Sequence, residues 1–453
     1  MLNPEVFRAY DIRGIIPDEI DEEGAYKIGC SYGSFLKNQT SKKNPKIVVQ
    51  SDARPSSPSL KAELIQGLLE KGLEVIDGGL ATTPMHYFTV NRTRADGGIM
   101  VTASHMPLPY NGFKVSLEGA VNIGTGAGME ELRDLAANIN MKTTSSRPIR
   151  VDQKNFENDY LEFLLKKIDP LKIKPFRIVV DAGNGMAGLL LEKLTKRLPI
   201  EAIPLYWEID MTFPNHEANP LKEETLAALQ NKVKESGADF GVAFDGDADR
   251  IGFVDESGQM IMADLSAAFL AEELFLKNHP GASIVYDIRS SRVVPEIIEK
   301  AGGKAFRSRT GHFYVKELMR REKAVFAAER SGHFYYQDFF YSESAILSFL
   351  YFIAALSQTN QKVSEITNRY GKYFSTGEIN FPLEDRSPRR LQEIAKKFED
   401  SKEVNWFDGL SVTYDDWWFN LRPSANDPLL RLTIEGKNQE IVNEKLELLK
   451  KLI

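Results

Sequence analysis

The stretch DFGVAFDGDADRIGFV, residues 239–254, sets the organisation of the chain. It begins and ends with short apolar runs that predict two buried strands. The turn between them carries Asp245, Asp247 and Asp249 at alternate positions, followed by Arg250. Like charges this close repel one another, and burying them without a counter-charge is costly. A hard divalent cation prefers oxygen ligands, so the turn is predicted to bind one.

Two other kinds of acidic loop are alternatives for this stretch. A calcium-binding EF-hand loop needs Gly at its sixth position and helices on both sides, but Arg250 takes that position and the flanks predict strands. We therefore reject the EF-hand, although the three aspartates and Glu256 fit its ligand positions. A haloacid-dehalogenase-type phosphatase would use Asp245 as nucleophile and Asp247 beside it, with Asp249 replacing its usual Thr or Val. That alternative stays open.

Three similar units follow one another along the chain. Each starts with an apolar run (residues 46–49, 177–180 and 283–286) and continues into a polar turn that carries an aspartate. Residues with helical spacing come next, and then a second strand-like run. The second runs are residues 73–76, 200–205 and 303–306. Because strand, helix and strand at this pitch predict parallel pairing with right-handed crossovers, we expect three similar α/β domains with mixed sheets.

Domain boundaries are expected where the composition changes. The 453 residues are too many for one hydrophobic core. A polar stretch at residues 140–153 predicts a linker. The last part of the chain predicts a smaller α+β domain, because strand-like runs form a meander that ends with an amphipathic helix at 441–453. Those runs are residues 378–383, 410–414, 417–421 and 429–434, and the expected domains are residues 1–150, 151–254, 255–368 and 369–453.

Composition and charge narrow the possible functions. The net charge of −7 disfavours binding to nucleic acid or to an anionic membrane. The single cysteine, Cys30, excludes a disulfide within the chain and a cysteine-rich zinc site. The first 14 residues lack the apolar core of a signal peptide, and the most apolar long segment, residues 345–356, is too short to span a bilayer. We expect a cytoplasmic monomer or homodimer.

Two loops carry side chains that suit phosphate chemistry. Ser104 and His105 follow a strand-like run, which is a plausible position for a nucleophile, and Lys114 is close enough in sequence to reach an anion there. Arg422 to Pro428 offers a guanidinium with Ser and Asn donors, as phosphate binding requires. An ordinary loop and a plain Pro-Ser-Asn turn are the alternatives.

Three further motifs contain glycine. Residues 183–188 match the dinucleotide-binding fingerprint, but the equivalent turns of the other two units lack these glycines, so close packing is the alternative. Residues 309–312 and 329–333 are two Gly-His turns, each after a strand-like run. Glu and Ser can bind sugar hydroxyls and His can serve phosphate, although surface turns would look the same.

Taken together, these motifs resemble those of the α-D-phosphohexomutase family, and most closely its phosphomannomutase/phosphoglucomutase branch. The resemblance covers nearly the whole chain and implies four domains around a central cleft, the first three alike. The matching motifs are, in order, the opening motif at residues 7–14, the phosphoserine loop at 102–107, the magnesium loop at 245–250, the sugar-recognition loop at 329–333 and the phosphate-binding loop at 422–428.

The resemblance implies roles for these residues. Ser104 would carry a phosphoryl group, with His105, Arg13 and Lys114 beside it as catalytic residues. One Mg²⁺ per chain would be held by Ser104 together with the three aspartates of the magnesium loop. Glu329 and Ser331 would bind sugar hydroxyls. The substrate-binding residues implied are Tyr10, Arg250, Arg289, His312, Glu329, Ser331, His333, Arg422, Ser424 and Asn426.

The implied activity is that of an intramolecular phosphotransferase, an isomerase of hexose phosphates. It would interconvert the 1-phospho and 6-phospho forms of mannose and glucose through a bisphosphate intermediate, with a glucose 1,6-bisphosphate-type activator. Residues 110–114 favour this branch, and phosphoglucosamine mutase is the alternative within the family. Met106 and Arg289 depart from the family pattern, so a non-catalytic sugar-phosphate sensor is a third alternative beside the aspartyl phosphatase. Arg330 occupies the position of the sugar-recognition loop that varies within the family.

Overall fold

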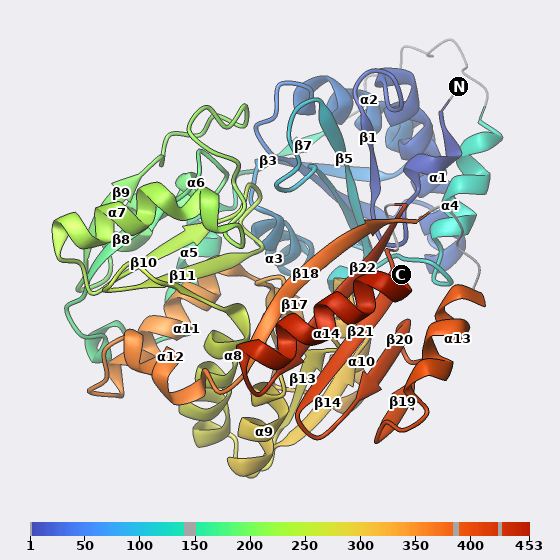
Figure 1. Cartoon of the computed structure of the whole chain (residues 1–453). Helices are drawn as coiled ribbons and strands as arrows, with labels where there is room; N and C mark the ends of the chain where they lie inside the picture. The colour runs from blue at the N-terminus through green and yellow to red at the C-terminus, as the bar shows by residue number, and fades with distance from the viewer. Residues whose placement is uncertain (1, 140–150, 384–388, 425–427) are drawn as a thin grey trace. The chain divides into compact units, whose positions relative to one another are not determined.

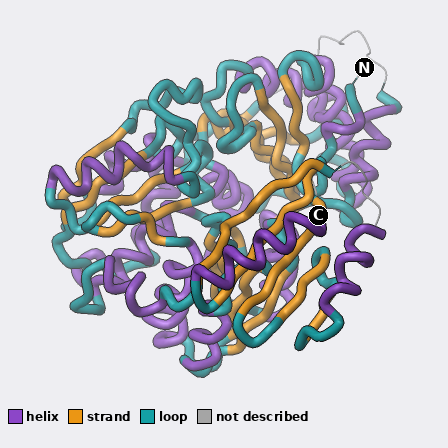
Figure 2. Tube along the Cα trace, in the orientation of Figure 1, coloured by secondary structure: helices purple, strands orange, loops and turns teal. Residues whose placement is uncertain are grey.

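The computed structural model describes residues 2–139, 151–383, 389–424 and 428–453, so most of the predicted linker lies outside the described residues (Figure 1). The chain forms two compact units. Unit 1 comprises Met1–Ile261 and Ser331–Val363, and unit 2 comprises Met262–Arg330 and Ser364–Ile453. Figure 2 shows the helices and strands along the chain. Among the described helices, none combines the length and apolarity that crossing a membrane requires.

The first sheet of unit 1 is mixed. Its strands are β1 (Ile12–Ile15), β2 (Lys46–Ser51), β3 (Glu74–Leu80), β4 (Gly97–Val101), β5 (Tyr110–Leu117), β6 (Val121–Asn122) and β7 (Asp152–Gln153). Their order is β1-β5-β4-β2-β3-β7, with β6 beside β5. Strands β4, β2, β3 and β7 are parallel to one another. Strand β5 is antiparallel to both of its neighbours on this path, β1 and β4.

Four helices accompany this sheet, namely α1 (Glu22–Thr40), α2 (Ser57–Glu70), α3 (Thr83–Thr93) and α4 (Met129–Ala137). Helix α1 begins where the Asp21 side chain accepts a hydrogen bond from the Gly24 N–H at 2.7 Å. It crosses α2 closely because Gly29 and Gly67 have no side chain. A Cβ at either position would lie 2.2 Å from a carbonyl oxygen of the other helix.

The second sheet of unit 1 carries the acidic turn. Its strands are β8 (Arg177–Asp181), β9 (Glu201–Leu205), β10 (Phe240–Phe244), β11 (Ile251–Asp255) and β12 (Met260–Ile261), in the order β12-β11-β10-β8-β9. Every residue of β10 and β11 is buried, as their apolar sequences predict. Helices α5 (Glu157–Leu165), α6 (Gly188–Thr195) and α7 (Ala227–Ser236) belong to this part of the chain.

Residues 331–363 return to unit 1 after the chain has left it. They form the antiparallel pair β16 (Phe334–Tyr336) and β17 (Ser342–Glu343) and the helix α11 (Ala345–Ser357). The Phe352 ring of α11 stacks on Phe253 of β11, with ring centroids 4.0 Å apart. The segment predicted to be a buried helix is therefore a core element of unit 1, while the boundary predicted near residue 368 stays a prediction.

Unit 2 begins with a parallel arrangement around one central strand. Strand β13 (Ser283–Asp287) lies between β14 (Lys304–Ser308) and β15 (Phe326–Ala328). The helices of this region are α8 (Ala263–Leu270), α9 (Val293–Lys300), α10 (His312–Glu322) and α12 (Ser364–Tyr370).

The other sheet of unit 2 is antiparallel. Its strands are β18 (Phe374–Pro382), β19 (Glu403–Asn405), β20 (Leu410–Thr413), β21 (Trp417–Pro423) and β22 (Leu429–Gly436), in the order β18-β22-β21-β20-β19. The predicted meander is confirmed for β20 to β22, but β18 pairs with the last strand. Helices α13 (Arg389–Ala395) and α14 (Gln439–Leu452) pack on this sheet through apolar side chains, and Figure 1 shows α14 lying along the strands.

The predicted repeat is confirmed by one turn that recurs in the structure. In each of the three repeats, the first strand pairs in parallel with the second strand (β2 with β3, β8 with β9, β13 with β14). An aspartate is the last residue of β8 and of β13 and directly follows β2, and in each case its Oδ1 accepts the backbone N–H of the residue two places on. These pairs are Asp52 with Arg54 at 3.1 Å, Asp181 with Gly183 at 2.7 Å, and Asp287 with Arg289 at 2.6 Å.

Candidate active site

The acidic turn is held in shape by its own first aspartate. Strands β10 and β11 are antiparallel neighbours, so residues 245–250 form the connection between them. Asp245 Oδ1 accepts the backbone N–H groups of Asp249 and Arg250 at 3.0 and 3.1 Å. Its Oδ2 accepts from Arg250 Nε at 2.9 Å. The turn predicted between two buried strands is therefore confirmed, and the strands exclude the EF-hand.

The donor set of the turn fits a divalent cation. Asp245, Asp247 and Asp249 are all buried, and each offers a carboxylate oxygen within 4.8 Å of the others. Asp247 Oδ1 is buried without a hydrogen-bond partner among the described residues. Burial and the nearby Asp249 raise the pKa of the Asp245 carboxyl. Hard oxygen donors with an unmet charge are what Mg²⁺ prefers in proteins.

Three side chains from elsewhere in unit 1 face the same carboxylates. Lys114 Nζ donates to Asp247 Oδ2 at 2.6 Å and to Asp249 Oδ2 at 2.5 Å. Although burial lowers it, these two carboxylates hold the pKa of Lys114 well above its usual value, so the ammonium stays charged. Thr83 donates to Asp247 at 2.6 Å, and His333 Nε2 lies 3.3 Å from Asp249 Oδ1.

Ser104 lies against this turn, as its predicted role requires. Its Oγ donates to Asp245 Oδ2 at 3.1 Å and lies 3.4 Å from Arg250 Nη2. The Ser104 backbone has a φ of 55°, in the left-handed region, and its N–H donates to Thr102 Oγ1 at 3.0 Å. Gly246 permits the approach, because a Cβ there would lie 2.5 Å from the Ser104 carbonyl oxygen.

His105 is held in its neutral form. Burial and the charges of Arg250 and Arg13 lower the pKa of His105 well below its usual value. Its Nδ1 lies 3.4 Å from Ser104 Oγ and accepts a hydrogen bond from Arg250 Nη2. Of the remaining residues predicted here, Arg13 pairs with Asp11 at 2.5 Å and Tyr10 is half-buried.

Arg54 is a buried residue next to Ser104 that the sequence analysis did not select. It has 0% exposed surface. Its Nη2 donates to the carbonyl oxygens of Ser104 and Met106 at 2.8 and 2.6 Å, and its Nη1 donates to that of Tyr110 at 3.1 Å. Its Nε lies 3.3 Å from Asp52 Oδ2. One guanidinium therefore holds three carbonyl groups of the segment that runs from Ser104 to Tyr110.

Replacing Arg54 with Met is expected to lower the free energy of unfolding by about 3 kcal/mol, because Asp52 would remain buried without its counter-charge. Urea unfolding followed by fluorescence measures this change. The control is Arg92→Met, which breaks an exposed ion pair with Asp159 and is expected to cost less than about 1 kcal/mol. Equal effects of the two variants would contradict this role of Arg54.

The glycine fingerprint at residues 183–188 also supports the acidic turn. A Cβ at Gly185 would lie 2.9 Å from the Gly246 carbonyl oxygen, and the Met186 N–H donates to that oxygen at 2.8 Å. The glycine thus lets one loop approach the other closely. These contacts favour the packing alternative over dinucleotide binding.

Unit 2 brings together several of the residues predicted to bind substrate. Arg289 pairs with Asp287 at 2.6 Å and lies 4.0 Å from Glu329 and 3.6 Å from Glu378. Although burial lowers it, these carboxylates raise the pKa of Arg289, so it cannot release a proton near neutral pH. Glu329 Oε1 accepts the Gly311 N–H at 2.9 Å, which connects the two predicted Gly-His turns.

The phosphate-binding loop begins at the end of β21. Arg422 is buried, and its Nη2 donates to Glu378 Oε2 at 2.8 Å. Ser424 is buried, and its N–H donates to the Leu429 carbonyl oxygen at 2.7 Å. His312 is the first residue of α10, whereas Asn426 lies outside the described residues. Ser331 and His333 belong to unit 1, where Ser331 Oγ lies 2.9 Å from His333 Nδ1.

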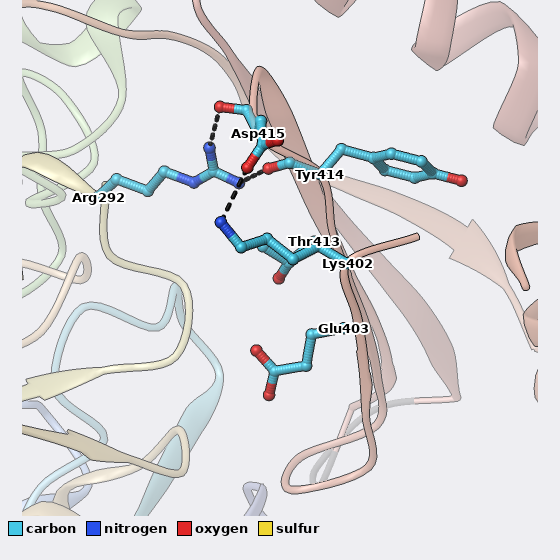
Figure 3. A pocket seen from close by; sticks show the side chains of 6 residues that line it. All are labelled: Arg292, Lys402, Glu403, Thr413, Tyr414 and Asp415. Carbon is cyan, nitrogen blue, oxygen red and sulfur yellow. Dashed lines mark hydrogen bonds and ion pairs between the residues drawn. The ribbon is translucent and has the colours of Figure 1, made fainter. Parts of the chain in front are cut away.

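A separate cavity of about 530 Å³ in unit 2 is lined by Arg292, Lys402, Glu403, Thr413, Tyr414 and Asp415 (Figure 3). The Arg292 guanidinium donates to the carbonyl oxygens of Tyr414 and Asp415 at 2.6 and 3.2 Å. Lys402 Nζ donates to Asp415 Oδ1 at 2.8 Å. Its cations are thus already engaged, and the cavity contains none of the residues selected from the sequence.

Four models of one protein family match the chain in succession. They describe phosphoglucomutase/phosphomannomutase alpha/beta/alpha domain I at residues 4–142, domain II at 158–258, domain III at 262–373 and the C-terminal domain at 378–449. The chain belongs to this family. The resemblance noted from the motifs is therefore confirmed, and with it the four-domain architecture.

Individual members of the family support this assignment over the full length. A phosphomannomutase of Vibrio cholerae is 39% identical over 455 residues, which cover 99% of this chain and 98% of that protein. A protein of Xanthomonas campestris named phosphohexose mutases is 38% identical, covering 97% and 96%. The crystal structure of a phosphoglucomutase/phosphomannomutase family protein from Burkholderia thailandensis has a TM-score of 0.90 at 32% identity, covering 100% and 97%.

Membership defines the class of reaction. Enzymes of the phosphoglucomutase/phosphomannomutase family are isomerases that move phosphate within a hexose phosphate, and this chain is a hexose-phosphate mutase. The buried aspartates of the magnesium loop fit the metal site that such an enzyme needs.

Proposed function

We propose that this mutase interconverts the 1-phospho and 6-phospho forms of mannose and glucose through a phosphoserine at Ser104. The observation that carries the proposal is the contact of Ser104 Oγ with the magnesium loop, 3.1 Å from Asp245 and 3.4 Å from Arg250. A serine oxygen beside an acidic metal loop and a guanidinium suits phosphoryl transfer, which depends on positioning and neutralisation of charge.

Asp245, Asp247 and Asp249 would hold one Mg²⁺, which when bound would neutralise charge on the transferred phosphoryl group. Arg250 and Lys114 would add positive charge near the same group. Ser104 would give its phosphoryl group to a sugar hydroxyl and later receive the other phosphate of the bisphosphate intermediate. The serine thus returns to its starting state, and glucose 1,6-bisphosphate would restore it after accidental hydrolysis.

The residues of unit 2 would bind the part of the substrate that does not react. Arg422, Ser424 and Asn426 would hold the distal phosphate, with His312 nearby, and Glu329 would bind sugar hydroxyls. Arg289 stays charged, so its role would be electrostatic and not that of a proton shuttle. Beside Asp249, Ser331 and His333 would act near the sugar and the transferred group.

The aspartyl-phosphatase alternative is disfavoured by the contacts of Asp245. Its Oδ1 accepts two backbone N–H groups, and its Oδ2 accepts from Ser104 and Arg250. A nucleophilic carboxylate would need an oxygen free to attack. A phosphoenzyme cleaved by hydroxylamine would nevertheless restore this alternative, because acyl phosphates are cleaved by it and phosphoserine is not.

Relative rates with the 1-phosphates of mannose, glucose and glucosamine test the substrate. Purified enzyme with Mg²⁺ and glucose 1,6-bisphosphate is expected to isomerise the mannose and glucose compounds at comparable rates. It should act at least about tenfold more slowly on the glucosamine compound, as an unmatched polar group in a sugar site implies. A preference for glucosamine 1-phosphate would contradict the proposal, and no isomerisation at all would favour a sensor. The cytoplasmic location and the monomeric or homodimeric state stay predictions.

A further inference from the structure

We infer that Glu378 is an internal counter-anion of the phosphate subsite: its carboxylate pairs with Arg422 when no phosphate is present, and gives up that guanidinium to the phosphate of the substrate. The inference rests on the proposed role of Arg422 in holding the distal phosphate. Glu378 was predicted only as part of a strand, and the mechanism described above does not use it.

The register of the antiparallel sheet places these charges together. Arg422 of β21 and Arg431 of β22 are direct cross-strand partners. Like charges in that position destabilise a sheet unless a third group compensates them. Glu378 lies on β18, the next strand, opposite Thr433, two residues from Arg431. It therefore faces both arginines from the neighbouring strand.

Both oxygens of the Glu378 carboxylate are engaged by guanidinium groups. Oε1 accepts from Arg431 Nη1 at 3.0 Å and Oε2 accepts from Arg422 Nη2 at 2.8 Å. Arg289 Nη1 approaches Oε2 to 3.6 Å. The Glu378 carboxylate is thus the shared counter-charge of three guanidinium groups. Its side chain is 25% exposed, whereas that of Arg422 is 6% exposed.

The charges of this cluster leave Arg422 short of negative charge. Glu378 is shared among Arg422, Arg431 and Arg289, so it compensates the charge of Arg422 only in part. Burial and the nearby Arg289 accordingly lower the pKa of Arg422. Although burial raises it, the three arginines hold the pKa of Glu378 below its ordinary value, so the carboxylate is ionised near neutral pH. A phosphate would supply the missing charge, and Glu378 supplies part of it when phosphate is absent.

The exchange of Arg422 between Glu378 and phosphate would assist one step of the proposed reaction. The bisphosphate must leave the phosphate subsite and bind again in the opposite orientation during each cycle. Without Glu378, releasing it would leave the buried Arg422 guanidinium short of a counter-charge, which is costly. Because Glu378 lowers that cost, it should weaken phosphate binding and speed release. Binding of Arg422 to Glu378 weakens its binding to phosphate, and binding of Arg422 to phosphate weakens its pairing with Glu378 by the same free energy.

The test uses Glu378→Gln in the full-length enzyme, with inorganic phosphate as the probe. Without phosphate the variant should melt at a lower temperature than the wild type. Phosphate should stabilise it more, with an apparent affinity raised about tenfold, as expected for loss of one competing charge. With mannose 1-phosphate as substrate, both KM and kcat should fall. A purely structural role would not lower KM.

Two further variants provide the controls. Asp415→Asn changes the net charge equally at an exposed carboxylate of unit 2, and its phosphate affinity and KM should equal those of the wild type. Arg422→Gln should weaken the phosphate response and raise KM. If it does not, the proposed phosphate role of Arg422 fails and the inference fails with it.

If Arg422→Gln behaves as expected but Glu378→Gln weakens phosphate binding, Glu378 only holds Arg422 in position and the inference alone is overturned. Should Glu378→Gln fail to fold, Glu378→Asp replaces it, since a carboxylate one methylene shorter contacts Arg422 less well. It should change affinity and kcat in the same direction by a smaller factor, and unchanged or weaker phosphate binding would likewise overturn the inference.

Discussion

Replacing Ser104 with Ala is expected to lower the rate of hexose-phosphate isomerisation by about 10⁵-fold, to the background of the assay. Removing a nucleophile that the rest of the site serves typically has an effect of this size. The protein should remain folded, because Ser104 Oγ contributes only a 3.1 Å hydrogen bond to Asp245 and weaker contacts to Arg250 and His105. A coupled assay with mannose 1-phosphate and a melting curve measure the two properties.

A matched control removes a buried hydroxyl from the same domain. Ser31 Oγ donates to the Leu132 carbonyl oxygen at 2.5 Å, and Ser31→Ala is expected to keep the activity within about twofold while costing about 1 kcal/mol of stability. Peptide mapping of the wild type by mass spectrometry should find phosphate on Ser104. Activity of Ser104→Ala near that of the wild type, or phosphate on Asp245, would refute the phosphoserine.

The second large effect concerns the metal. Dialysis against a chelator should abolish activity, and adding Mg²⁺ should restore it in the wild type. In Asp247→Asn we expect about 10³-fold lower activity that Mg²⁺ does not restore, because in the proposed site the buried Asp247 carboxylate would supply both charge and a ligand oxygen. Calorimetry with Mg²⁺ should detect binding to the wild type and not to the variant.

The control for this prediction lies just before the same strand. Asp239 is exposed, directly precedes β10, and accepts the Arg177 N–H at 2.7 Å, away from the magnesium loop. Asp239→Asn changes the net charge equally and should keep Mg²⁺ binding and activity within about twofold. Full activity of the wild type after exhaustive chelation would rule out a required metal.

Much of the fold could be predicted from local patterns. The apolar runs at residues 46–49, 177–180 and 283–286 correspond to β2, β8 and β13, because a buried parallel strand needs a continuous apolar sequence. The position of the acidic turn between two buried strands could be predicted as well, since apolar runs flank three alternate carboxylates in the sequence. The roles of these carboxylates and of Ser104 stay predictions. Their mutual contact is long-range and appears only in the structure.

The residues that the sequence analysis missed act through such long-range contacts. Arg54 fixes carbonyl groups about 50 residues further along, and Glu378 reaches Arg422 because β18 pairs with β22 and not with its neighbour in sequence. A signal for Arg54 was present: it occupies the same place in its repeat as Arg289, two residues after the aspartate. For Glu378, one glutamate in a strand-like run carried no comparable signal.

The return of residues 331–363 to unit 1 has a consequence for how the protein is made. A ribosome releases the chain in order, so β10 and β11 leave it long before α11 does. Until then, Phe240 and Phe253 lack the Phe352 ring that covers them. The nascent chain should therefore expose an apolar aromatic surface while some ninety further residues are translated. Chaperones that bind exposed apolar surfaces are expected to bind it during this interval.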